Sequence, residues 1–285
     1  MSIAAVIVLY NPDESVREAV HKLASQVSRT FIVDNSQYSH YVYMKDIPEV
    51  EYMFLEKNIG IAAAQNEAIK KILATDRYDK IVFSDQDSLI PEDGVDILAK
   101  AIEKLESMNV NVGAVASKAI NLSTGEAYPL GCSYIAEFDD TYTEVSWTLN
   151  SISLFNVNLF RQVGLMDETL FIDGVDCEIC WRASSIYGAR FFVCNDVEVL
   201  HQLGIGTKRI GGKWRSMTPP RRMYYQYRNF FWLMRRKYTP RVWIRTNGIK
   251  YMIKMFYYPL FGNHRLEYIK NICLGIAHGL FKSNS

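Results

Sequence analysis

The first 116 residues alternate between short apolar runs and segments of helical periodicity, and this alternation limits the fold more than any other feature. Residues 3–9 are continuously apolar, which is typical of a strand buried on both faces of a parallel sheet. Further strands are expected at 30–33, 51–55, 80–84 and 112–116, with helices between them. We therefore predict an α/β fold with a mostly parallel, doubly wound sheet and helices on both faces.

The remainder of the chain is less regular. We expect one long strand at 144–155, a short helix at 158–164, a helix at 175–187, a strand at 189–193, and helices at 221–237, 241–258 and 264–281. Within 241–258 the arginines and lysines fall on nearly opposite sides of a helical wheel. Asn247-Gly248 is therefore expected to divide this segment into two short helices.

Charge divides the chain in two. The 285 residues have a net charge of +1, but residues 1–206 carry 15 basic against 30 acidic side chains. Residues 207–285 carry 17 basic side chains against one acid, Glu267. We predict two parts with these boundaries, a folded acidic domain (1–206) and a basic, aromatic-rich helical region (207–285) that meets an anionic surface.

The sequence predicts a cytoplasmic protein. Its N-terminus has no basic segment, and Asn11-Pro12-Asp13 ends the first apolar run too early for a signal peptide. No stretch reaches the roughly 18 apolar residues of a transmembrane helix. The five cysteines are odd in number and irregularly spaced, which indicates reduced thiols rather than a disulfide framework.

Two carboxylates, Asp85 and Asp87, directly follow the expected strand at 80–84. Like charges this close repel one another unless a cation neutralises them, and in an α/β sheet such a strand end opens onto the ligand crevice. A divalent metal, Mg²⁺ or Mn²⁺, is the economical explanation. Because a metal with few protein ligands usually holds phosphate oxygens, this segment suggests a nucleotide-diphosphate site.

Other polar residues are expected at the same edge of the sheet. Asp34 follows the strand at 30–33 and can accept the N3–H of a uracil or thymine ring, although Asp34-Asn35-Ser36 also suits an ordinary turn. Asn58-Ile59-Gly60 either binds an anion at the start of the next helix or simply begins that helix. Tyr10, after the first strand, is a further candidate for binding the nucleotide.

The order of these motifs resembles the family 2 glycosyltransferases of the nucleotide-diphospho-sugar type. The resemblance covers about 200 residues, from Val33-Asp34-Asn35-Ser36 through Asp85-Gln86-Asp87-Ser88 to His201-Gln202-Leu203-Gly204. Between them lie Asn58-Ile59-Gly60, Gly164-Leu165-Met166-Asp167-Glu168 and Phe171-Ile172-Asp173-Gly174-Val175-Asp176-Cys177-Glu178. The Asp-Gln-Asp-Ser, Phe-Ile-Asp-x-Val-Asp-x-Glu and His-x-Leu-Gly forms look most like the bacterial rhamnosyltransferase branch.

This resemblance implies a GT-A fold and transfer of a sugar with inversion. It assigns Asp34 to the base and Asp85 to the ribose or diphosphate side of the donor. It assigns Asp87, with His201, to a Mg²⁺ or Mn²⁺ ion that bridges the diphosphate. Such an ion stabilises the negative charge that grows on the departing diphosphate.

Inverting transfer also needs a base that takes the proton of the acceptor hydroxyl. Asp173, Asp176 and Glu178 are the candidates. Asp176 matches the position of the base in the family and is the predicted catalytic residue. The alternative is that Asp173 or Asp176 only caps the helix at 175–187.

The basic region offers further contacts. The glycine-rich segment 204–218 is expected to close over the donor phosphates, with Lys208, Arg209, Lys213, Arg215, Arg222 and Arg228 as candidates to neutralise them. Its cations and aromatic residues suit helices that lie on an anionic membrane leaflet, but they also suit contact with another subunit. Nucleic-acid binding is not expected, because the acidic domain would repel phosphates.

The sequence thus predicts a metal-dependent inverting glycosyltransferase, associated peripherally with the inner face of the cell membrane. By resemblance, its donor is dTDP-β-L-rhamnose and its acceptor a lipid-linked oligosaccharide of a surface polysaccharide such as O-antigen or capsule. One alternative is a UDP-hexose donor on the same fold. The other is a catalytically silent, membrane-docked sugar-nucleotide-binding protein, against which the retention of Asp87 and Asp176 argues.

Overall fold

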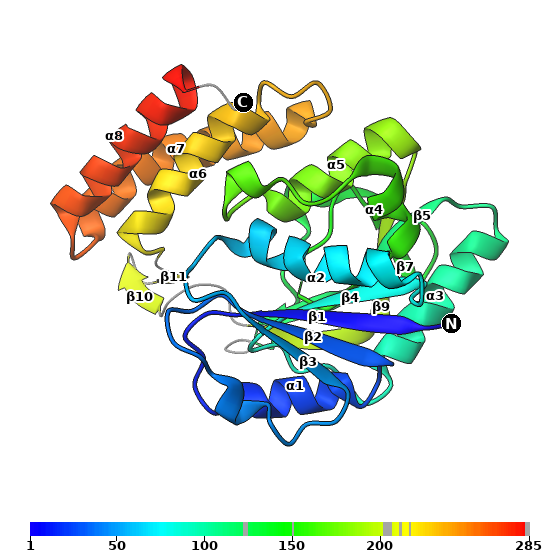
Figure 1. The fold of residues 1–285 in the computed structure, drawn as a ribbon. Helices are drawn as coiled ribbons and strands as arrows, with labels where there is room; N and C mark the ends of the chain where they lie inside the picture. The colour runs from blue at the N-terminus through cyan, green and yellow to red at the C-terminus, as the bar shows by residue number, and fades with distance from the viewer. Residues whose placement is uncertain (122–124, 150, 202–206, 211–212, 217, 283–285) are drawn as a thin grey trace. The chain divides into compact units, whose positions relative to one another are not determined.

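The chain divides into two compact units. The computed structural model describes residues 1–121, 125–149, 151–201, 207–210, 213–216 and 218–282, of which 201, 207–210 and 213–216 by their backbone only. Met1–Phe171 and Val175–His201 form the first unit, an α/β structure. Ile172–Gly174 and Gln202–Ser285 form the second, which is largely helical (Figure 1).

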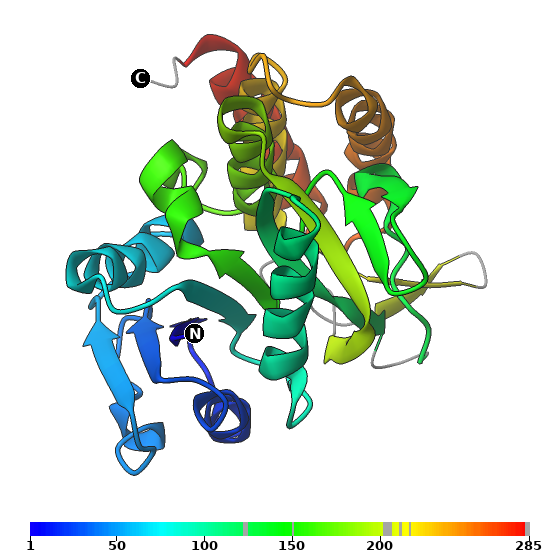
Figure 2. The ribbon, with the colours of Figure 1, turned by 90° about the vertical axis from the view of Figure 1, so that its right-hand side faces the viewer.

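The first unit is built on a nine-stranded sheet of order β3-β2-β1-β4-β8-β5-β9-β7-β6. The strands are β1 (Ile3–Leu9), β2 (Arg29–Asp34), β3 (Val50–Phe54), β4 (Lys80–Asp85), β5 (Val112–Asn121), β6 (Tyr134–Glu137), β7 (Tyr142–Val145), β8 (Ser153–Asn156) and β9 (Arg190–His201). Strands β3, β2, β1 and β4 are parallel, as are β5 and β9. Strand β8 runs antiparallel between β4 and β5, and β6 and β7 complete the far edge, also antiparallel (Figure 2).

Helices cover both faces of this sheet, as the sequence predicted. Helices α1 (Val16–Ala24) and α3 (Gly94–Ser107) share one apolar core with side chains of β1, β4, β5, β8 and β9. Helix α2 (Ile61–Thr75) lies on the opposite face from α1 (Figure 1). Helices α4 (Val157–Val163) and α5 (Val175–Tyr187) pack against each other, and they contact β8 and β5 respectively.

The single strand expected at 144–155 is wrong. Strand β7 ends at Val145 and pairs with β9, whereas β8 begins at Ser153 and pairs with β4 and β5. Ile152, directly before β8, has φ of 57°, a left-handed conformation that an extended strand cannot contain. The two strands therefore occupy different places in the sheet.

Three helices make up most of the second unit: α6 (Pro220–Leu233), α7 (Arg241–Phe261) and α8 (Arg265–Phe281). Before them the backbone forms an antiparallel pair, β10 (Thr207–Ile210) with β11 (Lys213–Ser216), within the segment expected to be a loop. The backbones of α6 and α8 approach closely at two glycines. A Cβ at Gly275 would lie 2.5 Å from the carbonyl oxygen of Tyr224, and one at Gly279 would lie 3.0 Å from that of Arg228.

Helix α7 is continuous, so the expected break at Asn247-Gly248 is wrong. The side chain of Asn247 is buried, and its Nδ2 donates a hydrogen bond of 3.1 Å to the carbonyl of Trp243 inside the helix. Lys254 is not a surface charge: it is half-buried, and its Nζ donates a hydrogen bond of 2.9 Å to Gln226 Oε1 on α6. Among the described residues, no helix combines the length and apolarity that a membrane span requires.

Candidate active site

Three neighbouring parallel strands end together and bring the predicted donor-binding residues to one edge of the sheet. Strand β1 lies between β2 and β4, with Leu9 opposite Asp34 and Val8 opposite Asp85. The backbone N–H of Tyr10, which follows Leu9, donates a hydrogen bond of 2.8 Å to Gln86 Oε1. Tyr10, Asp34 and Asp85 therefore meet where α/β sheets bind ligands, beyond the carboxyl ends of their strands.

The carboxylate of Asp34 is buried in a dense set of hydrogen bonds. Its Oδ1 accepts from the backbone N–H of Ser36 at 3.1 Å. Its Oδ2 accepts from the hydroxyl of Tyr52 at 2.5 Å and the backbone N–H of His40 at 2.8 Å, and lies 3.0 Å from His40 Nδ1. Burial raises the pKa of Asp34, but these donors outweigh it and hold the pKa below its ordinary value. Its predicted contact with the base stays a prediction.

Asn58 and Gly60 shape the start of α2. The side-chain Nδ2 of Asn35 donates to Asn58 Oδ1 at 3.1 Å, and the backbone N–H of Gly60 donates to the same oxygen at 2.9 Å. Gly60 has φ of +92°, and a Cβ there would lie 2.7 Å from the carbonyl oxygen of Phe171. That same carbonyl accepts the N–H of Ile61 at 2.7 Å. The motif thus begins helix α2, and its alternative role as an anion site stays a prediction.

The predicted metal ligands lie on adjoining segments. Asp85 ends β4, and Asp87 is exposed in the turn that follows. Leu89 forms an isolated antiparallel bridge with Leu200, so the end of β9, at His201, runs beside this turn. Among the residues whose side chains are described, no group of three His, Cys, Asp or Glu is arranged to hold a metal. The side chain of His201 lies outside that description.

The three candidate bases have different surroundings. Glu178 is 1% exposed, and Arg182 donates to its two oxygens at 2.8 and 3.0 Å while also donating to the carbonyls of Val163 and Leu165. Glu178 therefore holds α5 against the end of α4. Asp176, in the first turn of α5, is half-buried.

Asp173 belongs to the second unit. The guanidinium of Arg222 binds its carboxylate through both oxygens, at 2.9 to 3.1 Å, and Asn229 Nδ2 donates to its carbonyl at 2.8 Å. Phe171 and Asp173 both have φ of 65°, and Gly174 has φ of 89°. The carboxylate of Asp173 is therefore paired with an arginine within a strained segment, which argues against Asp173 as the base.

Arg228 is enclosed by aromatic rings. Its guanidinium carbon lies 4.2 Å from the ring centroid of Trp232, 5.0 Å from that of Tyr225 and 5.4 Å from that of Tyr224. Its Nε donates to Asn229 Oδ1 at 3.0 Å, and the residue is buried. Cation–π contacts thus explain why the Arg228 side chain is buried in the helical unit. Its contact with a donor stays a prediction.

Comparison with known proteins decides the family. The model of glycosyl transferase family 2 matches residues 4–164, which contain Asp34, Asn58, Asp85 and Asp87. The chain belongs to glycosyl transferase family 2. It is 29% identical to the dTDP-rhamnosyl transferase RfbF of Shigella flexneri, over 98% of this chain and 95% of that protein.

Solved structures share the fold of this glycosyltransferase. Residues 1–349 of S. aureus TarS in complex with UDP-GlcNAc match it with a TM-score of 0.60 and 14% identity, over 97% of this chain and 81% of that one. GalNAc-T7 with UDP, GalNAc and Mn²⁺ matches with a TM-score of 0.57 and 14% identity, over 93% and 58% of the two chains. The expected GT-A architecture is thereby confirmed.

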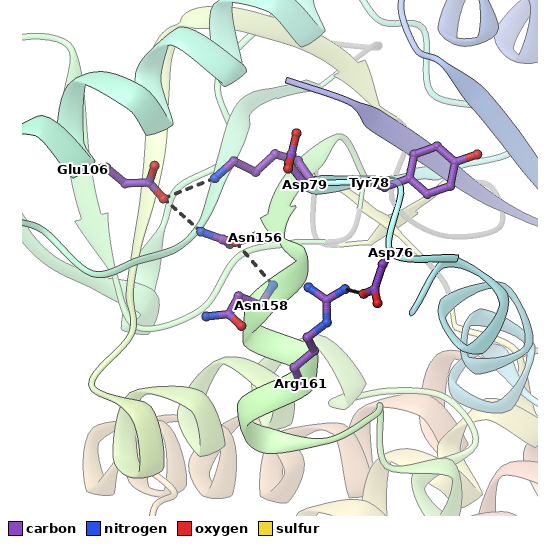
Figure 3. Close-up of a pocket in the computed structure, with 8 residues that line it drawn as sticks. Asp76, Tyr78, Asp79, Glu106, Asn156, Asn158 and Arg161 are labelled. Atoms are coloured by element: carbon purple, nitrogen blue, oxygen red, sulfur yellow. Dashed lines mark hydrogen bonds and ion pairs between the residues drawn. The ribbon is translucent and has the colours of Figure 1, made fainter. Parts of the chain in front are cut away.

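A polar hollow of about 420 Å³ lies at the opposite end of β4 from Asp85, and Figure 3 shows the residues that line it. It is lined by residues at the start of β4 and the end of β8, where Lys80 pairs with Glu106 at 3.2 Å. Asp76 pairs with Arg161 across it. A further carboxylate in its lining, Asp79, accepts from the backbone N–H of Ser2. The hollow lies away from the strand ends that carry the family's motifs.

Sequence reasoning missed several residues that shape the site. His40 and Tyr52 hold Asp34, yet both lie outside the recognised motifs, and a lone tyrosine in a strand carries no signal of its own. Outside the site, in the second unit, Lys254 was placed only on a helical wheel, whereas its Nζ contacts Gln226 and burial lowers its pKa to about 8, with a further contribution from Lys250. These roles depend on contacts between segments far apart in the chain.

Proposed function

We propose that this glycosyltransferase moves L-rhamnose, with inversion, from dTDP-β-L-rhamnose to a lipid-linked oligosaccharide of a surface polysaccharide such as O-antigen or capsule. The observation that carries the proposal is the 29% identity to a dTDP-rhamnosyl transferase, which extends over 98% of the chain and so includes the helical unit as well as the sheet. The meeting of Tyr10, Asp34 and Asp85 at one sheet edge supports a nucleotide site in that region.

Each residue has a separate part in the proposed reaction. Asp34 is the proposed acceptor of the N3–H of the thymine ring, since an ionised carboxylate can only accept hydrogen bonds. Because its side chain is 0% exposed and its Oδ2 already accepts from Tyr52 and His40, the ring would have to displace one of these donors. Asn58 and Gly60 orient the start of α2 toward the donor. Asp176 takes the proton of the acceptor hydroxyl as that oxygen attacks the anomeric carbon and the diphosphate leaves from the opposite face. Asp176 is chosen among the three candidates because it occupies the position of the base in the family's motif at residues 171–178.

The residues after β4 fit a divalent cation. Asp87 is exposed, and no contact of its carboxylate with another described residue is present to compete with a ligand. Two carboxylates, Asp85 and Asp87, with an imidazole from His201 make a donor set that Mg²⁺ or Mn²⁺ accepts. When bound, the ion neutralises charge on the departing diphosphate.

A lipid-linked acceptor would place the enzyme at the inner face of the cell membrane. The excess of cations in residues 207–285, 17 against one acid, suits such a surface. The inner face of the membrane is the cytoplasmic side, and we propose that the enzyme meets its donor, a nucleotide-activated sugar, there.

Donor choice is the direct test of this proposal. The protein is incubated with Mg²⁺ or Mn²⁺ and with dTDP-rhamnose, UDP-galactose or UDP-N-acetylglucosamine in turn, and released nucleoside diphosphate and glycosylated lipid are measured. We expect turnover with dTDP-rhamnose and none with UDP-galactose or UDP-N-acetylglucosamine. Turnover with a UDP-hexose instead would assign a different donor. Tight donor binding without hydrolysis or transfer, on any acceptor extract, would support a catalytically silent protein.

A further inference from the structure

Helix α7 carries large apolar side chains on the face that points away from its own unit. Six of them are between 54% and 67% exposed: Val242, Ile249, Met252, Ile253, Phe256 and Leu260. Five of the six follow spacings of seven, four, three and four residues, which places them on one side of a helix. The buried residues of the same helix, Trp243, Asn247 and Tyr258, lie on the other side. We call this exposed set the outer face of α7.

The outer face is long and continuous. From its first to its last residue the helix rises about 27 Å. Helix α8 adds exposed apolar residues, among them Leu266 at 81% and Phe281 at 85%. About half of the exposed large apolar side chains in the described part of the chain belong to these two helices. Soluble surfaces rarely gather apolar residues in this way unless another surface covers them.

Cations accompany the outer face, and acids do not. Arg241, Arg245 and Lys250 are exposed on α7, and the helix contains no Asp or Glu. By helical periodicity, Arg245 lies within the apolar stripe, beside Met252 and Phe256. A long side chain in that position can lay its methylene groups along the apolar surface while its charge reaches a polar layer.

We propose that the outer face of α7 lies in the interface of an anionic lipid bilayer, with Ile253 and Phe256 among the acyl chains and Arg241, Arg245 and Lys250 at the headgroups. An apolar stripe flanked by cations, on a helix too polar to span a membrane, suits contact with the boundary between headgroups and acyl chains, while the opposite side of α7 packs within its own unit. This inference rests on the membrane association proposed above and names the surface of the protein that makes the contact with lipid.

The charges favour lipid over a second copy of the chain. In a two-fold interface the same patch meets itself, so both copies would bring Arg241, Arg245 and Lys250 into one interface, to which α7 contributes no Asp or Glu. Glu267 is the one acid of residues 207–285 that could offset them. Anionic headgroups, in contrast, neutralise each of these cations.

Vesicle flotation with the full-length protein tests the inference. We expect the wild-type protein to float with phosphatidylglycerol–phosphatidylethanolamine vesicles and to stay at the bottom with phosphatidylcholine vesicles. Ile253→Gln with Phe256→Gln should weaken binding to the anionic vesicles at least about tenfold, because two apolar anchors are lost. Arg241→Gln with Arg245→Gln should weaken it about tenfold and flatten its dependence on salt.

A matched pair of substitutions controls for the loss of exposed apolar surface. Val42 and Ile186 are 60% and 64% exposed but lie in the first unit. Val42→Gln with Ile186→Gln should leave flotation unchanged. Unfolding transitions of every variant are compared with that of the wild type, so that a misfolded protein is recognised.

Three results would overturn the inference. The first is a wild-type protein that does not float with anionic vesicles. The second is flotation that Ile253→Gln with Phe256→Gln does not change. The third is a loss of self-association in these variants, measured by sedimentation without lipid, while flotation persists; this would assign the face to a second copy. Transfer to a delipidated, soluble acceptor is measured in parallel, and we expect it to be unchanged, so that failure of lipid binding is distinct from failure of the proposed transfer.

Discussion

The carboxylate of Asp34 is removed from solvent and yet held in its ionised form. Its burial alone would raise the pKa, but donors from Ser36, Tyr52 and His40 lower it further than burial raises it. A carboxyl whose folded pKa is lowered stabilises the protein at pH values above its unfolded pKa, and this stability is lost as the pH falls through the folded pKa. The region that is expected to read the base is thus also an acid-sensitive point of the fold.

Tyr52→Phe tests this balance. Removing the hydroxyl leaves Asp34 with one donor fewer, so its pKa should rise, and acid unfolding should begin at a higher pH. At neutral pH the free energy of unfolding should fall by about 2 kcal/mol, the scale of a hydrogen bond to a charged group. Chemical denaturation across a pH series measures both effects. Tyr38→Phe, at a tyrosine that is 73% exposed, is the control and should change neither.

Asp176→Asn tests the proposed base. The substitution removes the group that accepts the proton but keeps the size of the side chain, so transfer should fall about a thousandfold while binding of dTDP-rhamnose stays within about twofold of wild type. Calorimetry measures the binding and a coupled nucleotide assay the turnover. Near-normal turnover would exclude Asp176 as the base.

Glu178→Gln should behave in the opposite manner. Glu178 lies two residues further along α5, but its carboxylate is buried against Arg182. Its loss leaves the guanidinium partly unpaired, so the free energy of unfolding should drop by about 3 kcal/mol. Turnover per folded molecule, measured below the unfolding transition, should remain close to that of the wild type. A catalytic defect without a change in stability would contradict this structural role.

At the scale of elements, hydrophobic periodicity predicted the buried strands and helices well. It failed where tertiary contacts determine whether an element continues or breaks. The apolar runs of β1, β2 and β4 were recognised because both faces of each are covered. The segment 144–155 has enough apolar residues for one strand, but a left-handed residue at Ile152 divides it into two that lie apart in the sheet. Similarly, α7 was expected to break because its arginines and lysines fall on nearly opposite sides of a helical wheel, whereas Lys254 contacts Gln226 on α6 and the helix is continuous.

The packing of α6 and α8 predicts that alanine substitutions at two glycines, Gly275 and Gly248, change the free energy of unfolding in opposite directions. Gly275 faces the backbone of α6, and a Cβ there would meet the carbonyl oxygen of Tyr224 at 2.5 Å. Gly275→Ala should therefore lower the free energy of unfolding by about 2 kcal/mol, since the helices must separate.

Gly248→Ala, within α7, is the matched change. Its Cβ would lie 3.5 Å from the ring of Phe230, an ordinary contact, and alanine favours the helix by up to about 1 kcal/mol. Urea denaturation of both variants should show opposite shifts of the midpoint. Equal destabilisation by the two substitutions would mean that the close approach of α6 and α8 is not what makes Gly275 necessary.

At the scale of the whole molecule, the charge split near residue 206 comes close to the division between the two compact units. One departure from it was not predictable. Ile172–Gly174 belongs to the second unit, because Asn229 binds the carbonyls of Ile172 and Asp173, and Arg222 binds the carboxylate of Asp173. Contacts between residues some fifty positions apart produce no periodic pattern in a sequence. The site motifs were recognisable because their order is shared with a family, whereas the contacts that hold them join segments far apart in the sequence.

The proposed metal site depends on the fold of the first unit, because its proposed ligands lie at or just beyond the ends of two different strands. The bridge between Leu89 and Leu200 joins these ends. We expect EDTA to stop transfer and added Mg²⁺ or Mn²⁺ to restore it. Asp87→Asn should raise the metal concentration that gives half-maximal activity by more than about tenfold, since even the outer-shell partners of a metal are worth that much. Asp93→Asn, at an exposed acid before α3, should not change it. Full activity in EDTA would remove the cation from the mechanism, and the basic side chains would then have to neutralise the leaving diphosphate by themselves.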